Sequence, residues 1–157
     1  MTVERRRAAR VLLLDEQDRL LLFRGVDPAA PGATWWFTPG GGLEPGEDLH
    51  GAATRELAEE TGLHDVAVGP VVAYGTVSFS FRGQRFEQDQ WFLLARTTRT
   101  DIDSSGTGAE EHALLLEARW WTPAELRCTS ETVYPLGLAG FLEHLLAEGP
   151  PVTPVRL

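Results

Sequence analysis

The stretch that decides the fold is Gly41–Leu63, which reads GGLEPGEDLHGAATRELAEETGL. Asp48 is a residue type that caps helix N-termini, and Gly62 suits the left-handed position at which helices end. The residues between them predict a helix over Leu49–Thr61. Acidic side chains crowd this stretch, and Arg55 is its one arginine or lysine. The carboxylates are Glu44, Glu47, Asp48, Glu56, Glu59 and Glu60.

Helical spacing places three of these carboxylates beside the apolar side of the predicted helix. That side carries Leu49, Ala52, Ala53 and Leu57. At 3.6 residues per turn, Glu56, Glu59 and Glu60 fall within an arc of about 100° next to this row. Carboxylates that face an interior repel one another and lose hydration, and one arginine does not neutralise three of them. A hard divalent cation does, so Mg²⁺ or Mn²⁺ is the expected cofactor; the alternative is a solvated acidic face.

The spacing of the whole stretch resembles the Nudix box. That pattern is a glycine, five residues, a glutamate, seven residues, and then Arg-Glu-aliphatic-any-Glu-Glu-any-Gly-aliphatic. All seven fixed identities and both aliphatic classes match without a gap, at Gly41, Glu47, Arg55, Glu56, Leu57, Glu59, Glu60, Gly62 and Leu63. A preceding aromatic strand that ends in Pro-Gly-Gly and a later Trp-Trp-Thr-Pro-Ala-Glu-Leu element extend the resemblance over most of the chain.

The resemblance implies an α/β fold, in which an α/β/α sandwich surrounds a mixed sheet. A single domain would span residues 1–157, with 149–157 as an irregular tail. The activity implied is metal-dependent hydrolysis of a nucleoside diphosphate linked to another group, with metal-activated water attacking phosphorus. The implied metal ligands are Glu56, Glu59 and Glu60, with a backbone carbonyl of Gly40 or Gly41. Catalysis would also involve Glu59, while Arg55 orients a ligand and Glu47 acts through water or a hydrogen bond.

Apolar periodicity and turn residues predict the remaining elements. Strands and helices interleave with hairpins, which indicates a mixed sheet between helices, α/β or α+β. The expected strands are 10–14, 19–24, 35–38, 66–68, 71–81, 85–96 and 114–121, and the further helices begin at Pro123 and span 136–148. The expected loops are Asp27–Ala33, the flexible glycine-rich 39–42, and the polar, mobile segment Thr97–Ala113.

The box does not identify the catalytic base. The loop Thr97–Ala113 contains Glu110 and Glu111, either of which could serve, although a solvated loop pair is the alternative. Glu87 and Asp89 are weaker candidates.

Aromatic and basic residues near the box are candidates for substrate binding. Strand alternation puts Trp35 and Phe37 on one face, where a nucleobase could stack, and Trp36 on the other face. Further candidates are Phe79 and Phe81, which lie downstream where some relatives of this family carry a tyrosine, and Arg24, which would contact phosphate or form a surface ion pair.

Composition and net charge exclude some classes of binding partner. The formal net charge is −9, which argues against a nucleic-acid or anionic-membrane partner and favours a small nucleoside diphosphate derivative screened by a cation. Cys128 is a lone cysteine, so no internal disulfide is expected. The apolar run near the N-terminus is too short for a signal segment or a membrane span, which predicts a cytoplasmic protein. The apolar stripe over 138–146 belongs either to the core or to a homodimer face.

Two classes of function follow from these features. The first is a diphosphatase that acts on a nucleoside triphosphate, a nucleotide sugar or a similar compound. The second is a noncatalytic Nudix-fold sensor that binds a nucleotide. Sensors commonly lose box residues once hydrolysis is not needed, and here every box residue is present, which favours the enzyme.

Overall fold

Two long strands bring distant parts of the chain side by side. The computed structural model describes residues 2–107 and 115–157. Strand β1 (Val3–Leu14) pairs in parallel with β6 (Gln84–Arg96) from Val3 opposite Arg85 to Leu14 opposite Arg96. In the described part of the chain the sheet order is β3-β2-β1-β6-β5-β8, with β4 beside β1 and β7 beside β2. The other strands are β2 (Leu20–Asp27), β3 (Ala30–Phe37), β4 (Gly40–Gly42), β5 (Val68–Phe81), β7 (Leu115–Trp121) and β8 (Val155–Arg156).

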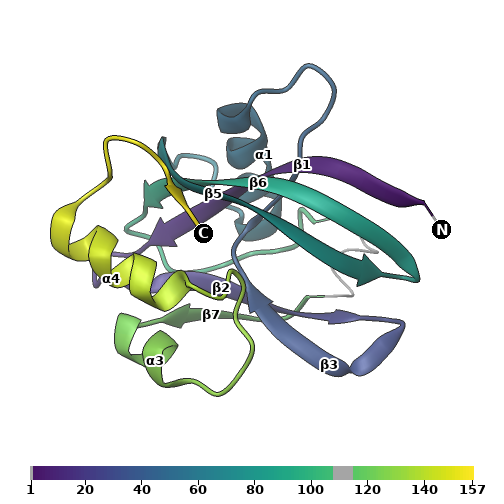
Figure 1. The fold of residues 1–157 in the computed structure, drawn as a ribbon. Coiled ribbons are helices and arrows are strands. Elements are labelled where there is room, and N and C mark those ends of the chain that lie inside the picture. Colours follow the sequence, from purple (N-terminus) through teal and green to yellow (C-terminus); the bar gives the residue numbers. More distant parts are fainter. Residues whose placement is uncertain (1, 108–114) are drawn as a thin grey trace.

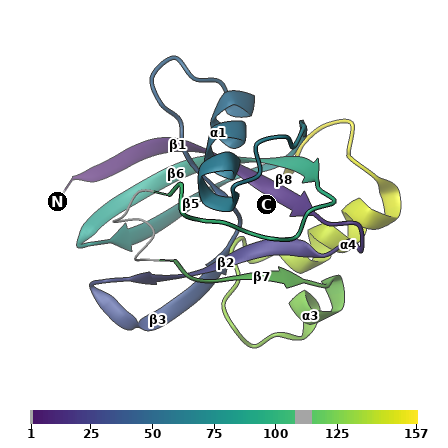
Figure 2. The same ribbon diagram turned by 180° about the vertical axis from the view of Figure 1, so that it is seen from behind.

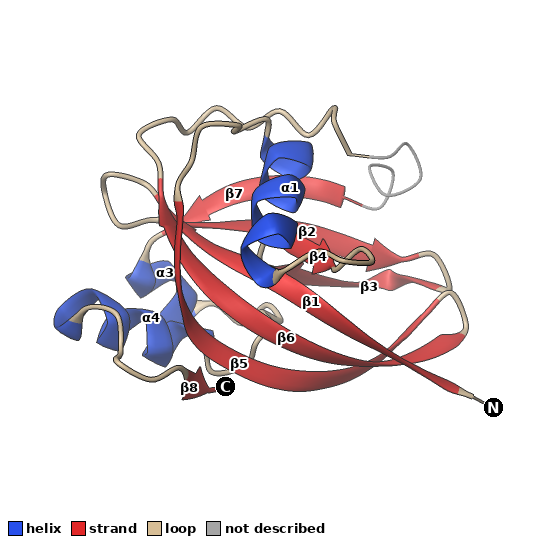
Figure 3. Cartoon of the chain, turned by 90° about the horizontal axis from the view of Figure 1, so that it is seen from above, coloured by secondary structure: helices blue, strands red, loops and turns tan. Residues whose placement is uncertain are grey.

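Helices cover both faces of this mixed sheet, which confirms the predicted α/β fold. Helix α1 (Leu49–Thr61) lies on one face, and α3 (Pro123–Cys128) and α4 (Leu138–Glu148) lie on the other (Figures 1 and 2). Figure 3 shows α1 lying across the strands at the point where β4 meets β1. Helix α1 has the predicted bounds, because the Asp48 carboxylate accepts a hydrogen bond from the Gly51 amide at 2.7 Å and Gly62 has a φ of 74°.

Alternation along the central strands divides the core into two layers. In β1, Leu12 and Leu14 pack with α3 and α4, whereas Val11 and Leu13 pack with α1. Because both faces are covered at this end of β1, Val11–Leu14 is continuously apolar rather than alternating with polar residues. The apolar stripe of α4 packs into this core through Leu138, Phe141, Leu142 and Leu145.

The prediction of a loop over Asp27–Ala33 is wrong. Strand β2 continues to Asp27 and β3 begins at Ala30, so only a tight turn separates the two strands. The Asp27 carboxylate supports this turn by accepting hydrogen bonds from the amides of Ala29 and Arg82. Pro31 is tolerated because β3 is an edge strand of the described sheet.

The flexible loop expected over residues 39–42 is also wrong, because Gly40–Gly42 forms β4 and pairs with Ala8–Arg10 of β1. The approach is so close that a Cβ at Gly40 would lie 2.2 Å from the Ala9 carbonyl oxygen, and the φ of Gly40 is 137°. Glycine is therefore needed for pairing rather than for flexibility.

Two further segments are more ordered than the sequence indicates. Within residues 149–157, Val155–Arg156 forms β8 beside β5, and the Leu157 amide donates to the Tyr74 carbonyl at 2.8 Å. The described part of the polar loop, residues 97–107, is attached to the end of α1, where the Asp103 amide donates to the Thr61 carbonyl at 2.9 Å. No described helix combines the length and the apolar character needed to cross a membrane.

Two glycine substitutions test this description of the helix ends and faces. Gly62→Ala should lower the free energy of unfolding by about 1–2 kcal/mol, because its left-handed backbone disfavours a side chain and the new Cβ would lie 3.2 Å from Asp103. Gly140→Ala, on the exposed side of α4 with open space around it, should raise stability by about 0.5–1 kcal/mol. Urea unfolding measures both; stabilisation by Gly62→Ala would contradict the assigned C-cap.

Candidate functional site

Helix α1 directs two of its carboxylates toward the sheet, as its periodicity predicts. Glu60 is 6% exposed, and the side chain of Glu56 is 14% exposed. Glu59 lies nearer the solvent, with its side chain 42% exposed. The opposite side of the helix presents Thr54 to solvent. The acidic run is therefore not a solvated face.

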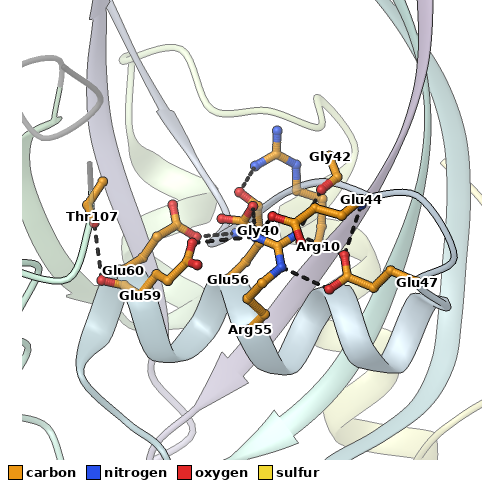
Figure 4. Close-up of polar contacts among 10 residues, drawn as sticks. All are labelled: Arg10, Gly40, Gly42, Glu44, Glu47, Arg55, Glu56, Glu59, Glu60 and Thr107. Atoms are coloured by element: carbon orange, nitrogen blue, oxygen red, sulfur yellow. Dashed lines mark hydrogen bonds and ion pairs between the residues drawn. The ribbon is translucent and has the colours of Figure 1, made fainter. Parts of the chain in front are cut away.

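The two buried carboxylates lie against the backbone of β4, as Figure 4 shows for Glu60 and Gly40. The Gly40 amide donates to Oε1 of Glu60 at 2.7 Å. A Cβ at Gly41 would lie 2.5 Å from Oε1 of Glu56, so only a glycine lets that carboxylate come so near. Helix and strand thus place two carboxylates next to one short stretch of backbone.

Arg55 links the site to the loop before the helix. Its Nε and Nη2 donate to the two carboxylate oxygens of Glu47, each at 2.8 Å. Its Nη2 also donates to the Gly42 carbonyl at 3.0 Å, and its Nη1 donates to Oε1 of Glu56 at 3.0 Å. A weaker contact reaches Glu59 at 3.4 Å. The guanidinium therefore holds the positions of two box glutamates relative to β4.

This pairing changes the acidity of both partners. The hydrogen bonds from Arg55, together with one from the Glu44 amide, lower the pKa of Glu47 from 4.5 to about 2. The same bonds to Glu47 raise the pKa of Arg55, against the effect of its burial. Glu47 is consequently a carboxylate throughout the neutral range.

Arg10 is the residue of this site that sequence reasoning missed. Its Nη1 donates to the carbonyl oxygen of Thr38 at 3.2 Å and to that of Gly40 at 3.1 Å, the second of which Figure 4 shows. Burial lowers the pKa of its guanidinium, and the nearby charges of Glu60 and Glu56 oppose that shift. The available signal was a charged residue inside the apolar run Ala8–Leu14. A strand that packs on both faces rarely buries an arginine unless the arginine has a partner.

The donor set fits a hard divalent cation. Carboxylate oxygens and backbone carbonyls are the ligands that Mg²⁺ and Mn²⁺ prefer. Such groups are present here, since the Glu60 carboxylate accepts a hydrogen bond from the Gly40 amide and the Glu56 carboxylate lies next to Gly41. In residues 2–107 and 115–157, no three acidic, histidine or cysteine side chains gather around one point. Positive charge at the described site comes from Arg55 and Arg10.

The aromatic candidates beside the site are divided between core and surface. Trp36 is buried and packs edge-on against Trp121, with the ring centres 5.0 Å apart. Trp35 and Phe37 are half-buried, and Phe37 lies 5.9 Å from the Arg10 guanidinium carbon. Phe37 therefore contacts Arg10, a residue of the carboxylate site.

The other predicted contacts lie farther along the sheet. Arg24 pairs with Glu117 at 3.3 Å and approaches Glu131 at 3.9 Å, as the surface ion-pair alternative predicts. Phe79 stacks on Phe86 across the β5–β6 hairpin with ring centres 5.2 Å apart. Phe81 packs beneath the guanidinium of Arg82 at the tip of the same hairpin.

The candidates for the catalytic base have different positions. Asp89 accepts hydrogen bonds from Arg5 and Thr76, and Glu87 pairs with Arg5, so both belong to an ion-pair cluster on the strands. Glu110 and Glu111 lie outside the described residues.

Comparison with known proteins identifies relatives of this chain. The NUDIX domain model matches residues 4–145. RNA pyrophosphohydrolase of Novosphingobium aromaticivorans is 33% identical over 127 residues, which cover 74% of this chain and 76% of that protein. A putative 8-oxo-dGTP diphosphatase of Bacillus subtilis is 28% identical over 116 residues, which cover 74% and 66%.

Solved structures share the fold at low sequence identity. The MutT protein from Methanosarcina mazei Go1 superimposes with a TM-score of 0.64 at 19% identity, covering 94% of this chain and 97% of its own. A C. elegans Ap4A hydrolase gives a TM-score of 0.62 at 18% identity, covering 90% and 98%.

The Arg55–Glu47 pair predicts how stability depends on pH. Because folding lowers the pKa of Glu47, the carboxylate contributes stability above its unfolded pKa of 4.5, and this contribution is lost as pH falls toward about 2. Glu47→Gln should therefore destabilise the protein at pH 7 and make progressively less difference below pH 4.5. Urea unfolding at several pH values measures this, with Glu148→Gln at the exposed end of α4 as the matched control. A wild-type advantage that persists unchanged at low pH would refute the assignment.

Proposed function

The chain belongs to the Nudix family of pyrophosphohydrolases, and we propose that it hydrolyses the pyrophosphate linkage of a nucleoside diphosphate derivative with Mg²⁺ or Mn²⁺. The observation that carries this proposal is the pair of carboxylates, Glu56 and Glu60, buried against the Gly40–Gly41 backbone at the centre of a complete Nudix box. The complete box also favours an enzyme over a noncatalytic sensor.

Glu56, Glu59 and Glu60 would hold the cation, with the carbonyl oxygen of Gly40 or Gly41 as a backbone ligand. A cation bound there would neutralise phosphate charge and lower the pKa of water near the phosphorus. Glu59 extends from the buried pair toward solvent, since its side chain is 42% exposed. Exposure of the three glutamates therefore increases from Glu60 through Glu56 to Glu59, which is the one a diphosphate in solvent would meet first.

Arg55 and Glu47 would act as positioning residues. The 3.0 Å bond from Arg55 restricts the side chain of Glu56, and the two bonds to Glu47 restrict Arg55 in turn. A carboxylate whose orientation is restricted in this way loses less conformational freedom when it binds a cation or a substrate.

Two substrate classes share the required chemistry. The net charge of −9 favours a small nucleotide, such as the oxidised nucleoside triphosphate in the name of the Bacillus subtilis relative. The relatives named RNA pyrophosphohydrolase favour the 5′ end of an RNA instead. Both classes carry a pyrophosphate on a 5′ nucleoside, and we propose that this group is what the box carboxylates recognise.

A substrate panel tests the activity. Nucleoside triphosphates, 8-oxo-dGTP, ADP-ribose, nucleotide sugars, dinucleoside polyphosphates and 5′-triphosphorylated oligoribonucleotides would each be incubated with Mg²⁺ or Mn²⁺, and released phosphate measured. At least one compound should be cleaved, and Glu60→Gln should reduce kcat roughly 10²-fold or more. Glu148→Gln, on the exposed end of α4, should leave turnover unchanged. No cleavage of any compound with either metal would overturn the proposal.

The base is tested separately. We propose that Glu110 or Glu111 accepts the proton of the attacking water, as their place in the downstream loop suggests. Replacing the true base with glutamine should lower kcat by about 10²–10⁴, the usual contribution of general-base catalysis, whereas the neighbouring substitution should have little effect. Full activity in both variants would return the role to Glu47 or to the metal site alone.

A further inference from the structure

Two arginines approach the buried carboxylates from different sides. Arg55 reaches Glu56 along the helix, whereas Arg10 comes from the sheet and has no place in the Nudix box. We propose that Arg10 is the internal counter-ion of Glu56 and Glu60, and that a divalent cation must displace it from the Gly40 carbonyl. This proposal rests on the metal site of the proposed function and assigns a residue that sets its affinity.

One backbone unit joins the arginine to the carboxylate. Gly40 donates its amide proton to Glu60 at 2.7 Å and accepts a hydrogen bond from Arg10 at 3.1 Å through its carbonyl oxygen. That carbonyl is also a backbone ligand proposed for the cation. A guanidinium and a divalent cation at one carbonyl oxygen would repel each other strongly in this partly buried place.

The charge of Arg10 also matters for the protein without a cation. Glu56 and Glu60 are largely removed from water, and such carboxylates need a nearby positive charge or a proton. The electrostatic partners that act on Arg10 include both of these glutamates. The charge of Arg10 therefore offsets part of the repulsion between the two glutamates in the apoprotein, and the same charge would repel a bound cation.

Arg10 has two further contacts that it could keep when a cation binds the Gly40 carbonyl. Its guanidinium carbon lies 5.9 Å from the centre of the Phe37 ring, within the range of cation–π contacts, and its other hydrogen bond goes to the Thr38 carbonyl at 3.2 Å. A short shift that keeps these two contacts would free Gly40.

A purely structural role for Arg10 makes the opposite prediction. If the arginine only braced the corner between β3 and β4, its removal would loosen the Gly40 backbone and weaken metal binding. If it is a competing counter-ion, its removal leaves the carboxylates with less positive charge nearby and strengthens metal binding. The sign of the change in metal affinity therefore separates the two roles.

The test is calorimetric titration of the metal-free protein with Mn²⁺ alone, at physiological ionic strength. Arg10→Met should bind Mn²⁺ at least about tenfold more tightly than the wild type, while its metal-free form melts at a lower temperature. Arg10→Lys, which keeps the charge, should bind within a few-fold of the wild type. Arg96→Met is the matched control, because it removes an exposed arginine that pairs with Asp18 rather than with a residue of the carboxylate site, and it should change the Kd less than about twofold.

The titration distinguishes failure of the Arg10 proposal from failure of the proposed metal site. Equal or weaker Mn²⁺ binding by Arg10→Met would overturn this proposal while leaving the metal site supported. No Mn²⁺ uptake by any of the proteins would overturn both. Circular dichroism verifies folding, and if Arg10→Met fails to fold, Arg10→Gln carries the same prediction.

Discussion

The structure depends on how it compensates the carboxyl groups of Glu56 and Glu60, which are largely removed from water. Such carboxylates are costly unless opposite charge or hydrogen-bond donors lie close by. Here the Gly40 amide donates to Glu60 and the Arg55 guanidinium donates to Glu56, while the Arg10 guanidinium adds positive charge from across the strand. The fold around α1 supplies this compensation, and the pyrophosphohydrolase chemistry of the family needs the charges that it preserves.

Backbone approach makes the arrangement possible. The pairing of β4 with β1 requires glycine at position 40, and the nearness of Glu56 to the backbone requires glycine at position 41. The N-cap and the C-cap of α1 set the length of the helix, so that its inward rows end beside this strand. The glutamates of α1 can therefore lie against β4 only because that strand is made of glycines.

The sequence predicted the helix and its inward carboxylates because both follow from local rules, namely capping residues and 3.6-residue periodicity. It missed β4 because a glycine run is typical of a loop, and its pairing with Ala8–Arg10 depends on contacts far apart in the chain. Arg10 was missed for the same reason. Its partners at positions 38, 40, 56 and 60 become neighbours only after folding, and no local pattern reports them.

The central claim is that Glu56 and Glu60, lying against Gly40–Gly41, form a site for a divalent cation. The most direct measurement is a crystal structure of the protein soaked in Mn²⁺, with the anomalous signal of manganese recorded. We expect a peak about 2.0–2.3 Å from carboxylate oxygens of both glutamates, with the Arg10 guanidinium moved off the Gly40 carbonyl. Manganese bound only elsewhere, with Arg10 still on that carbonyl, would contradict the account.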